Sequence, residues 1–182
     1  MKVFLTGATG FVGSHLSQQL EAAGHEVYSL ARSPEKFEKF RVGGTMIQGS
    51  LGHNHEHQWI ESLPDDLDAV IHTAGIVHSF SKEDFFQTNF QATENLVNDL
   101  KVKYPSLKFI FISSLAACGP AKRALPHREN AEALPVSDYG RSKLKAEDIL
   151  LHDSPGRWQK VIIRPPMVIG PRDPAIVDVF QM

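Results

Sequence analysis

Cysteine is almost absent from this sequence: Cys118 is the only one among 182 residues. A single cysteine excludes an internal disulfide and fits a reducing compartment. No apolar run approaches the ~20 residues that a membrane-spanning helix needs. The apolar stretch after Lys2 has only three residues, too few for the apolar region of a signal peptide. We therefore expect a cytoplasmic protein with no membrane partner.

A large excess of charge of one sign is also missing. The chain has 19 basic and 21 acidic residues, a formal net charge of -2, so electrostatics gives no reason to expect a nucleic-acid partner. Internal repeats and low-complexity segments are not found either. Hydrophobic residues make up 42% of the chain, which is enough for a proper core, and the length favours one domain.

Short apolar runs alternate with helical patterns along the whole chain. The predicted strands span 2–6, 26–31, 45–48, 68–73, 108–113 and 160–163, and the predicted helices 11–23, 34–40, 53–63, 82–103 and 137–152. This alternation predicts an α/β fold, a doubly wound parallel sheet of the Rossmann type. The strand runs are continuously apolar, as burial on both faces demands. We expect residues 116–135 to form a loop over the carboxyl edge of the sheet, where ligands of such folds bind.

Three glycines lie between the first predicted strand and the first predicted helix. Gly7, Gly10 and Gly13 allow a tight turn, close approach of a pyrophosphate, and close packing of helix on strand. The free N–H groups and the positive dipole end of the helix favour phosphate at the same place. The predicted cofactor contacts here are Gly7, Thr9, Gly10, Phe11, Val12 and Gly13.

The motifs of this chain resemble those of the extended short-chain dehydrogenase/reductase family. The matching segments, in chain order, are TGATGFVG (6–13), DAVIHTAG (68–75), NFQATENL (89–96), FISS (111–114), YGRSK (139–143) and RPPMVIGP (164–171). That family includes nucleotide-sugar epimerases, dihydroflavonol reductase-like enzymes and steroid dehydrogenases. The resemblance implies a dinucleotide cofactor and further contacts to it from Thr73, Ala74, Gly75, Asn89, Ser113, Pro166 and Val168.

The residue that ends the second strand predicts which dinucleotide binds. Arg32 lies about 20 residues past Gly13, where an acidic residue would select NAD and an arginine fits the 2′-phosphate of NADP. Lys36 adds positive charge. Ser50 and Leu51 follow the third strand, where the family usually places Asp, and Ser50 can hydrogen-bond adenine. We predict NADP, with NAD as the alternative.

Tyr139 and Lys143 are four residues apart on a predicted helix and therefore share one face. A phenol has a pKa of about 10, and a neighbouring ammonium lowers it. Tyr139 can then act as general acid or base toward a carbonyl or alcohol oxygen. The resemblance implies that Lys143 also holds the nicotinamide ribose and that Ser114 binds the substrate oxygen, with Ser113 as the rival for that role.

Three functions fit these residues. The first is an NAD(P)-dependent oxidoreductase that reduces a carbonyl or oxidises a secondary alcohol of a small-molecule substrate. The second is a nucleotide-sugar epimerase with bound NAD, against which Arg32 argues. The third is a non-catalytic NADP(H)-sensing protein, ranked last because Tyr139 and Lys143 are both present. Leu115 and Ala116 stand where dehydratases of the family typically carry an acidic pair, so dehydration is set aside.

The histidines and the single cysteine are not predicted to form a functional site. His53, His55 and His57 are two residues apart, so on a helix they cannot converge, and we predict no metal site. His72 is predicted to be a core or edge residue, and Cys118 a small loop or core residue.

The resemblance also bears on assembly and on length. It implies a homodimer through the helices at 82–103 and 137–152. Family members have a C-terminal substrate region, which the sequence analysis expects to be largely absent here. Residues 1–170 are then the NAD(P)-binding domain, and residues 171–182 the start of a truncated substrate-binding region.

Overall fold

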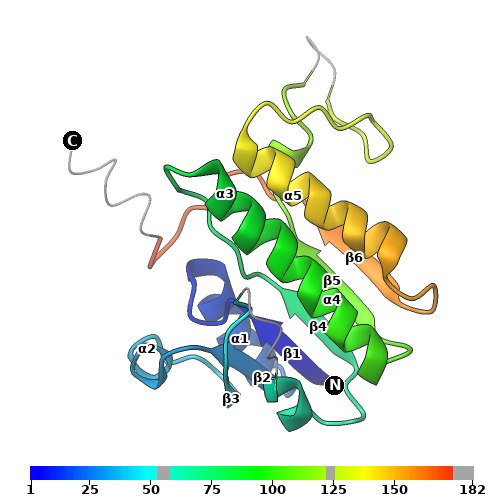
Figure 1. The fold of residues 1–182 in the computed structure, drawn as a ribbon. Coiled ribbons are helices and arrows are strands. Elements are labelled where there is room, and N and C mark those ends of the chain that lie inside the picture. Colours follow the sequence, from blue (N-terminus) through cyan, green and yellow to red (C-terminus); the bar gives the residue numbers. More distant parts are fainter. Residues whose placement is uncertain (53–57, 122–125, 174–182) are drawn as a thin grey trace.

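The computed structural model describes residues 1–52, 58–121 and 126–173. Its centre is a six-stranded sheet with the order β3-β2-β1-β4-β5-β6, in which every neighbouring pair is parallel (Figure 1). The strands are β1 (Lys2–Thr6), β2 (Glu26–Ala31), β3 (Thr45–Gln48), β4 (Ala69–His72), β5 (Lys108–Ile112) and β6 (Gln159–Ile163). The chain winds outward from β1 to β3, then returns to build β4 to β6 on the other side. This reversal puts the switch point of the sheet between β1 and β4.

Helices cover both faces of the sheet. They are α1 (Phe11–Ala22), α2 (Pro34–Lys39), α3 (Lys82–Phe85), α4 (Ala92–Lys103) and α5 (Asp138–Asp148). The π-helical segment η2 (Phe86–Gln91) joins α3 to α4, and η4 (Ile149–Asp153) extends α5. α4 and α5 lie side by side across one face, and α1 lies behind the sheet (Figure 1). The predicted doubly wound fold is therefore confirmed, and the predicted helices at 82–103 and 137–152 are found with a π-helical segment in each. None of the described helices combines the length and apolar character needed to cross a bilayer.

Successive residues of each strand pack into two different cores, one on each face. Phe4 of β1 belongs to the larger core under α4 and α5, whereas Val3 and Leu5 belong to the smaller core under α1. The period of two explains this division. It also confirms that the apolar strand runs are buried on both faces. The two edge strands are the exceptions: Val161 and Ile163 of β6 remain 49% and 45% exposed, and Thr45 and Gln48 of β3 are exposed.

One helix prediction is wrong. The described part of the segment at 53–63 is a short 3-10 helix, η1 (Gln58–Ser62), and residues 53–57 lie outside the described part of the chain. Trp59 is buried and donates from Nε1 to the Ser50 carbonyl at 3.1 Å. This contact ties the segment to the chain that leaves β3. Packing against the sheet decided its conformation.

Candidate active site

The glycine turn after β1 packs against the loop after β4, at the switch point of the sheet. Gly7 has φ +70°, and a Cβ on it would lie 2.6 Å from the Ala74 nitrogen. A Cβ on Gly13 would lie 2.2 Å from the Gly7 carbonyl oxygen. Both contacts are with backbone, so a side chain at either position would force the turn apart. The close helix-strand packing predicted from the glycine spacing is what the structure has.

The start of α1 fits an anionic group. Gly10 is the N-cap residue, makes no side-chain capping hydrogen bond, and precedes a first turn without acidic residues. A Cβ on Gly10 would lie 3.1 Å from the Gly7 oxygen, so the turn leaves little room for a side chain. Helix N-termini with free N–H groups bind phosphate. Thr9, Phe11 and Val12 are half-buried in the same turn.

The residues predicted to bind the adenosine end lie at the carboxyl ends of β2 and β3. Arg32 and Lys36 are exposed, and so is Ser50. Ser33 accepts a hydrogen bond from the Lys36 nitrogen at 3.2 Å and so caps α2. Leu51 is half-buried against the larger core. Two cationic side chains therefore stand at the surface beside the glycine turn, as a 2′-phosphate site requires.

The Asn89 side chain binds the backbone of the loop that follows β4. Its side chain accepts from the Ile76 nitrogen at 2.8 Å and donates to the Ile76 oxygen at 3.0 Å and to Ser142 Oγ at 3.1 Å. It is 1% exposed. Asn89 was predicted as a cofactor contact. Its polar atoms bind the loop and α5 instead. Thr73 and Ala74 lie against the glycine turn, whereas Gly75 lies against Asn89.

His72 links β1 to α4 in the core between the two cofactor loops. It makes hydrogen bonds with Thr6 Oγ1 through Nδ1 at 2.6 Å and with Thr93 Oγ1 through Nε2 at 2.8 Å. Complete burial, and then the charge of Lys143, lower the pKa of His72 to about 3. The imidazole is therefore neutral, and the expectation of a core histidine is confirmed.

Tyr139 meets Ser114 at the start of α5. Ser137 caps this helix by accepting from the Gly140 nitrogen at 3.0 Å. A Cβ on Gly140 would lie 2.3 Å from the Ala116 oxygen, so the helix begins in tight contact with the 3-10 turn η3 (Leu115–Ala117). Tyr139 is thereby brought close to Ser114. Burial raises the pKa of Tyr139, and the nearby Ser114 hydroxyl opposes the rise.

Lys143 lies beneath the same edge, 4% exposed. Its Nζ donates to the Ile112 carbonyl at 2.8 Å and lies 4.2 Å from the centre of the Phe111 ring. Burial lowers the pKa of Lys143 to about 7, with Glu147 acting against this. The expected net fall in the pKa of Tyr139 is wrong for this structure. The ammonium is turned toward a strand carbonyl, and burial of the phenol dominates its pKa.

The two candidate serines point in different directions. Ser113 is 4% exposed and its hydroxyl donates to the Glu147 carboxylate. Ser114 lies close to Tyr139 and lowers its pKa. Of the two serines, Ser114 is thus the one beside Tyr139, whereas Ser113, predicted as a cofactor contact, has its hydroxyl engaged inside.

Glu147 and Arg164 are the residues that the sequence analysis missed. Arg164 donates from Nε to the two Glu147 carboxylate oxygens at 3.0 and 3.2 Å. One signal was available, because Glu147 follows Lys143 at the same spacing of four that joins Lys143 to Tyr139.

The segment after β6 borders the site. Leu115 donates to the Pro165 carbonyl at 2.9 Å, which holds this segment beside η3. Pro166 and Val168, both predicted cofactor contacts, are exposed.

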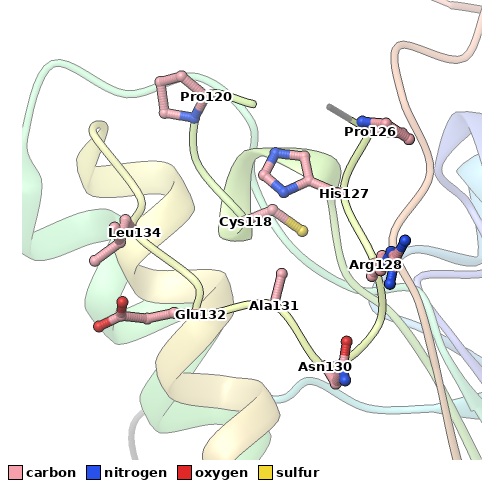
Figure 2. Close-up of a pocket in the computed structure, with 9 residues that line it drawn as sticks. All are labelled: Cys118, Pro120, Pro126, His127, Arg128, Asn130, Ala131, Glu132 and Leu134. Carbon is pink, nitrogen blue, oxygen red and sulfur yellow. The ribbon is translucent and has the colours of Figure 1, made fainter. Parts of the chain in front are cut away.

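A pocket of about 280 Å³ lies under the loop between η3 and α5 (Figure 2). The residues that line it are Cys118, Pro120, Pro126, His127, Arg128, Asn130, Ala131, Glu132 and Leu134. Beyond η3, the described residues of the predicted loop have no regular structure, and residues 122–125 lie outside the described part. Cys118 is buried, as expected. Within residues 1–52, 58–121 and 126–173 no three His, Cys, Asp or Glu side chains lie together as metal ligands would, and His53, His55 and His57 fall outside these ranges.

Known proteins resemble this chain over nearly all of its length. It is 31% identical over 182 residues to a sterol-4-alpha-carboxylate 3-dehydrogenase, decarboxylating, of Dictyostelium discoideum, covering 94% of this chain and 54% of the relative. It is 34% identical over 178 residues to the GDP-6-deoxy-D-mannose reductase of Pseudomonas aeruginosa, covering 93% and 53%. The chain thus spans about half the length of the curated relatives it matches.

A solved structure has a similar fold. The UDP-glucuronic acid 4-epimerase of Bacillus cereus, in complex with UDP-glucuronic acid and NAD, matches with a TM-score of 0.77 at 26% identity, covering 95% of this chain and 59% of that one. The sequence model of the NAD dependent epimerase/dehydratase family matches residues 3–178. A match of that extent leaves almost none of the chain outside it, and the protein therefore belongs to the NAD dependent epimerase/dehydratase family, among relatives that are dehydrogenases, reductases and epimerases.

Proposed function

We propose that this protein is an NADP(H)-dependent oxidoreductase that interconverts a carbonyl and a secondary alcohol by hydride transfer, with Tyr139 as the general acid/base. The observation that carries the proposal is the approach of Ser114, at the carboxyl end of β5, to Tyr139 on the helix that also carries the buried Lys143. Two relatives are by name a dehydrogenase and a reductase, which supports it.

The dinucleotide, when bound, supplies or accepts the hydride. In this proposal the turn of Gly7, Gly10 and Gly13 and the first N–H groups of α1 hold its pyrophosphate. Arg32 and Lys36 bind the 2′-phosphate. Further contacts come from Thr9, Phe11, Val12, Ser50, Leu51, Thr73, Ala74, Gly75, Pro166 and Val168.

The proton chemistry falls to Ser114, Tyr139 and Lys143. Ser114 and Tyr139 together hold the substrate oxygen. Because burial raises the pKa of Tyr139, the phenol stays protonated at neutral pH and is suited to donate its proton to a carbonyl being reduced. Lys143, when it carries a proton, stabilises the phenolate that remains.

Calorimetric titration with NADPH and with NADH tests the cofactor proposal. We expect tighter binding of NADPH, and a reversed preference in Arg32→Asp, because a carboxylate repels the 2′-phosphate and accepts from ribose hydroxyls. Lys39→Asp, which makes the same charge change on the far end of α2, should keep the wild-type preference. An unaltered ratio in Arg32→Asp would show that Arg32 is only a surface charge.

A nucleotide-sugar epimerase with bound NAD is the second candidate. The match to the Bacillus cereus epimerase favours it. NAD that stays with the protein through purification would support the epimerase, whereas an exchangeable NADPH supports the reductase. A non-catalytic NADP(H) sensor ranks third, because Tyr139 and Lys143 are both in place.

Assembly and setting complete the proposal. We place a homodimer interface on the helices of residues 82–103 and 137–152, which lie side by side on one face of the sheet (Figure 1). Exposure of Val102 (84%) and Leu151 (49%) on these helices supports this face. The scarcity of cysteine supports a cytoplasmic setting.

A further inference from the structure

Glu147 is a fully buried carboxylate on the helix that carries the proposed catalytic pair. Tyr139, Lys143 and Glu147 follow one another at intervals of four on α5, so the three lie along one face. Glu147 is 0% exposed. A buried carboxylate is costly unless it is paired and hydrogen-bonded. The Glu147 carboxylate has both kinds of partner, an ion pair with Arg164 and a hydrogen bond from Ser113.

The partners of Glu147 come from the carboxyl ends of two strands. Ser113 is the first residue after β5, and Arg164 is the first residue after β6. Arg164 contacts Glu147 through Nε and Nη2, and its Nη1 lies 3.3 Å from Cys118 Sγ, on the wall of the pocket in Figure 2. Glu147 therefore joins α5 to the carboxyl ends of β5 and β6. Ser113, which binds Glu147, is the chain neighbour of Ser114, which lies close to Tyr139.

Charge adds a second role. The buried cluster has two cations, Lys143 and Arg164, and one carboxylate. Arg164 is 25% exposed in its side chain and so keeps contact with water, whereas Lys143 is 4% exposed.

The groups that face Lys143 include no second carboxylate among the described residues. They are Glu147 on α5, the neutral His72 on β4, and the Phe111 ring and Ile112 carbonyl on β5. Glu147 opposes the fall in the pKa of Lys143 that burial causes.

We propose that Glu147 is a positioning residue for Tyr139 and Lys143, which sets α5 on the sheet through Arg164 and Ser113 and acts as the counter-charge of the buried Lys143. The catalytic side of this assignment rests on the proposed oxidoreductase function. Removing the carboxylate makes Lys143 lose its proton at lower pH. The reductive activity then declines at lower pH, because the phenolate left by proton transfer is no longer stabilised.

The test compares Glu147→Gln with Asp148→Asn, which removes one carboxylate from the exposed neighbour on the same helix. Lysine labelled with ¹³C at the ε position reports the titration of Lys143 by NMR, assigned by its loss in Lys143→Arg. We expect a lower pKa of Lys143 in Glu147→Gln and a wild-type titration in Asp148→Asn. The alkaline limb of the kcat profile for reduction should move with it, since each unit of pKa lowers the ammonium fraction above that pKa about tenfold.

A second variant serves as the control in case Glu147→Gln does not fold. Glu147→Gln/Arg164→Gln leaves no unpaired arginine and should fold; because it removes a cation together with the carboxylate, the pKa of Lys143 should lie between those of the wild type and Glu147→Gln. An unchanged titration in folded Glu147→Gln overturns the proposal, because Glu147 then serves only to neutralise Arg164. The NMR titration needs no turnover. A chain that shows the displaced titration but reduces no carbonyl supports the counter-charge role and overturns the proposed function instead.

Discussion

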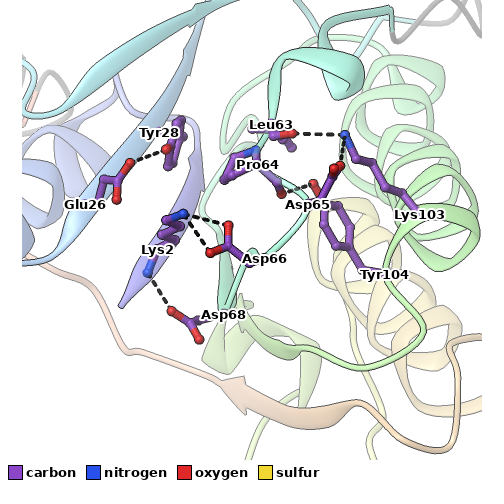
Figure 3. A network of polar contacts seen from close by, with 10 residues as sticks. All are labelled: Lys2, Glu26, Tyr28, Leu63, Pro64, Asp65, Asp66, Asp68, Lys103 and Tyr104. Carbon is purple, nitrogen blue, oxygen red and sulfur yellow. Dashed lines mark hydrogen bonds and ion pairs between the residues drawn. The ribbon is translucent and has the colours of Figure 1, made fainter.

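At the amino edge of the sheet charged side chains pair at the surface, whereas near the carboxyl ends of β4 and β5 ionisable side chains are buried. Figure 3 shows the amino edge, where Lys2 Nζ lies 2.6 Å from Asp66 and Lys103 Nζ lies 3.4 Å from Asp65. The two aspartates are 73% and 97% exposed in their side chains. The hydrogen bond between Lys2 and Asp66 raises the pKa of the lysine and lowers that of the aspartate. Both groups are thus held in their ordinary charged forms.

Near the carboxyl ends of β4 and β5 the ionisable groups are buried instead of exposed. Lys143, Glu147 and His72 are each at most 4% exposed. Burial lowers the pKa of Lys143 to about 7 and that of His72 to about 3. Groups moved away from their ordinary protonation by burial mark functional sites more often than surface pairs do. The contrast identifies the carboxyl edge as the place where chemistry is expected, and the amino edge as a place where chain segments are joined.

The largest effect is expected from the glycine turn. Gly13→Ala puts a methyl carbon 2.2 Å from the Gly7 oxygen, so the turn must open. We expect a loss of about 3 kcal/mol in the free energy of unfolding and loss of NADPH binding, measured by thermal unfolding and calorimetric titration. Gly156→Ala is the matched control, since no atom lies within 4 Å of its added carbon. Wild-type stability and binding in Gly13→Ala would mean that the turn is not closely packed in solution.

Two tyrosines, one at each edge, give the next comparison. Tyr139→Phe removes the proposed proton donor and should lower turnover about 10²- to 10⁴-fold, with nearly normal cofactor binding. Tyr104→Phe, at the amino edge, removes a 2.8 Å hydrogen bond to the Pro64 carbonyl. It should cost about 1 kcal/mol of stability and leave turnover unchanged. Equal effects of the two changes on turnover would remove Tyr139 from the mechanism.

The smallest effect at neutral pH is expected from His72, and it grows in acid. Its pKa is about 3 in the folded protein against an ordinary value of 6.5, so the unfolded chain takes up the proton first as the pH falls. The stability that the neutral imidazole contributes is present above pH 6.5 and is lost as the pH falls toward 3. The upper bound of this loss is about 5 kcal/mol. His72→Gln should flatten the fall of the urea unfolding free energy over this range, whereas His152→Gln, at an exposed position, should keep it. A slope that His72→Gln does not change would contradict the neutral buried imidazole.

The sequence alone determined the sheet and the location of the site. Continuous apolar runs and the spacing of Gly7, Gly10 and Gly13 predict a doubly wound fold with a phosphate-binding turn, because strand burial and turn geometry are encoded locally. The interval of four between Tyr139 and Lys143 places them on one helix face for the same reason.

Only the tertiary structure decided how these groups are paired and charged. In the folded chain the Ser113 hydroxyl donates to the buried Glu147, whereas Ser114 lies close to Tyr139, although the two serines are neighbours in the sequence. The fold brought Arg164 to Glu147, and it raised the pKa of Tyr139 where the sequence analysis expected a fall. Desolvation depends on what distant segments bury around a group, and no local spacing contains that information.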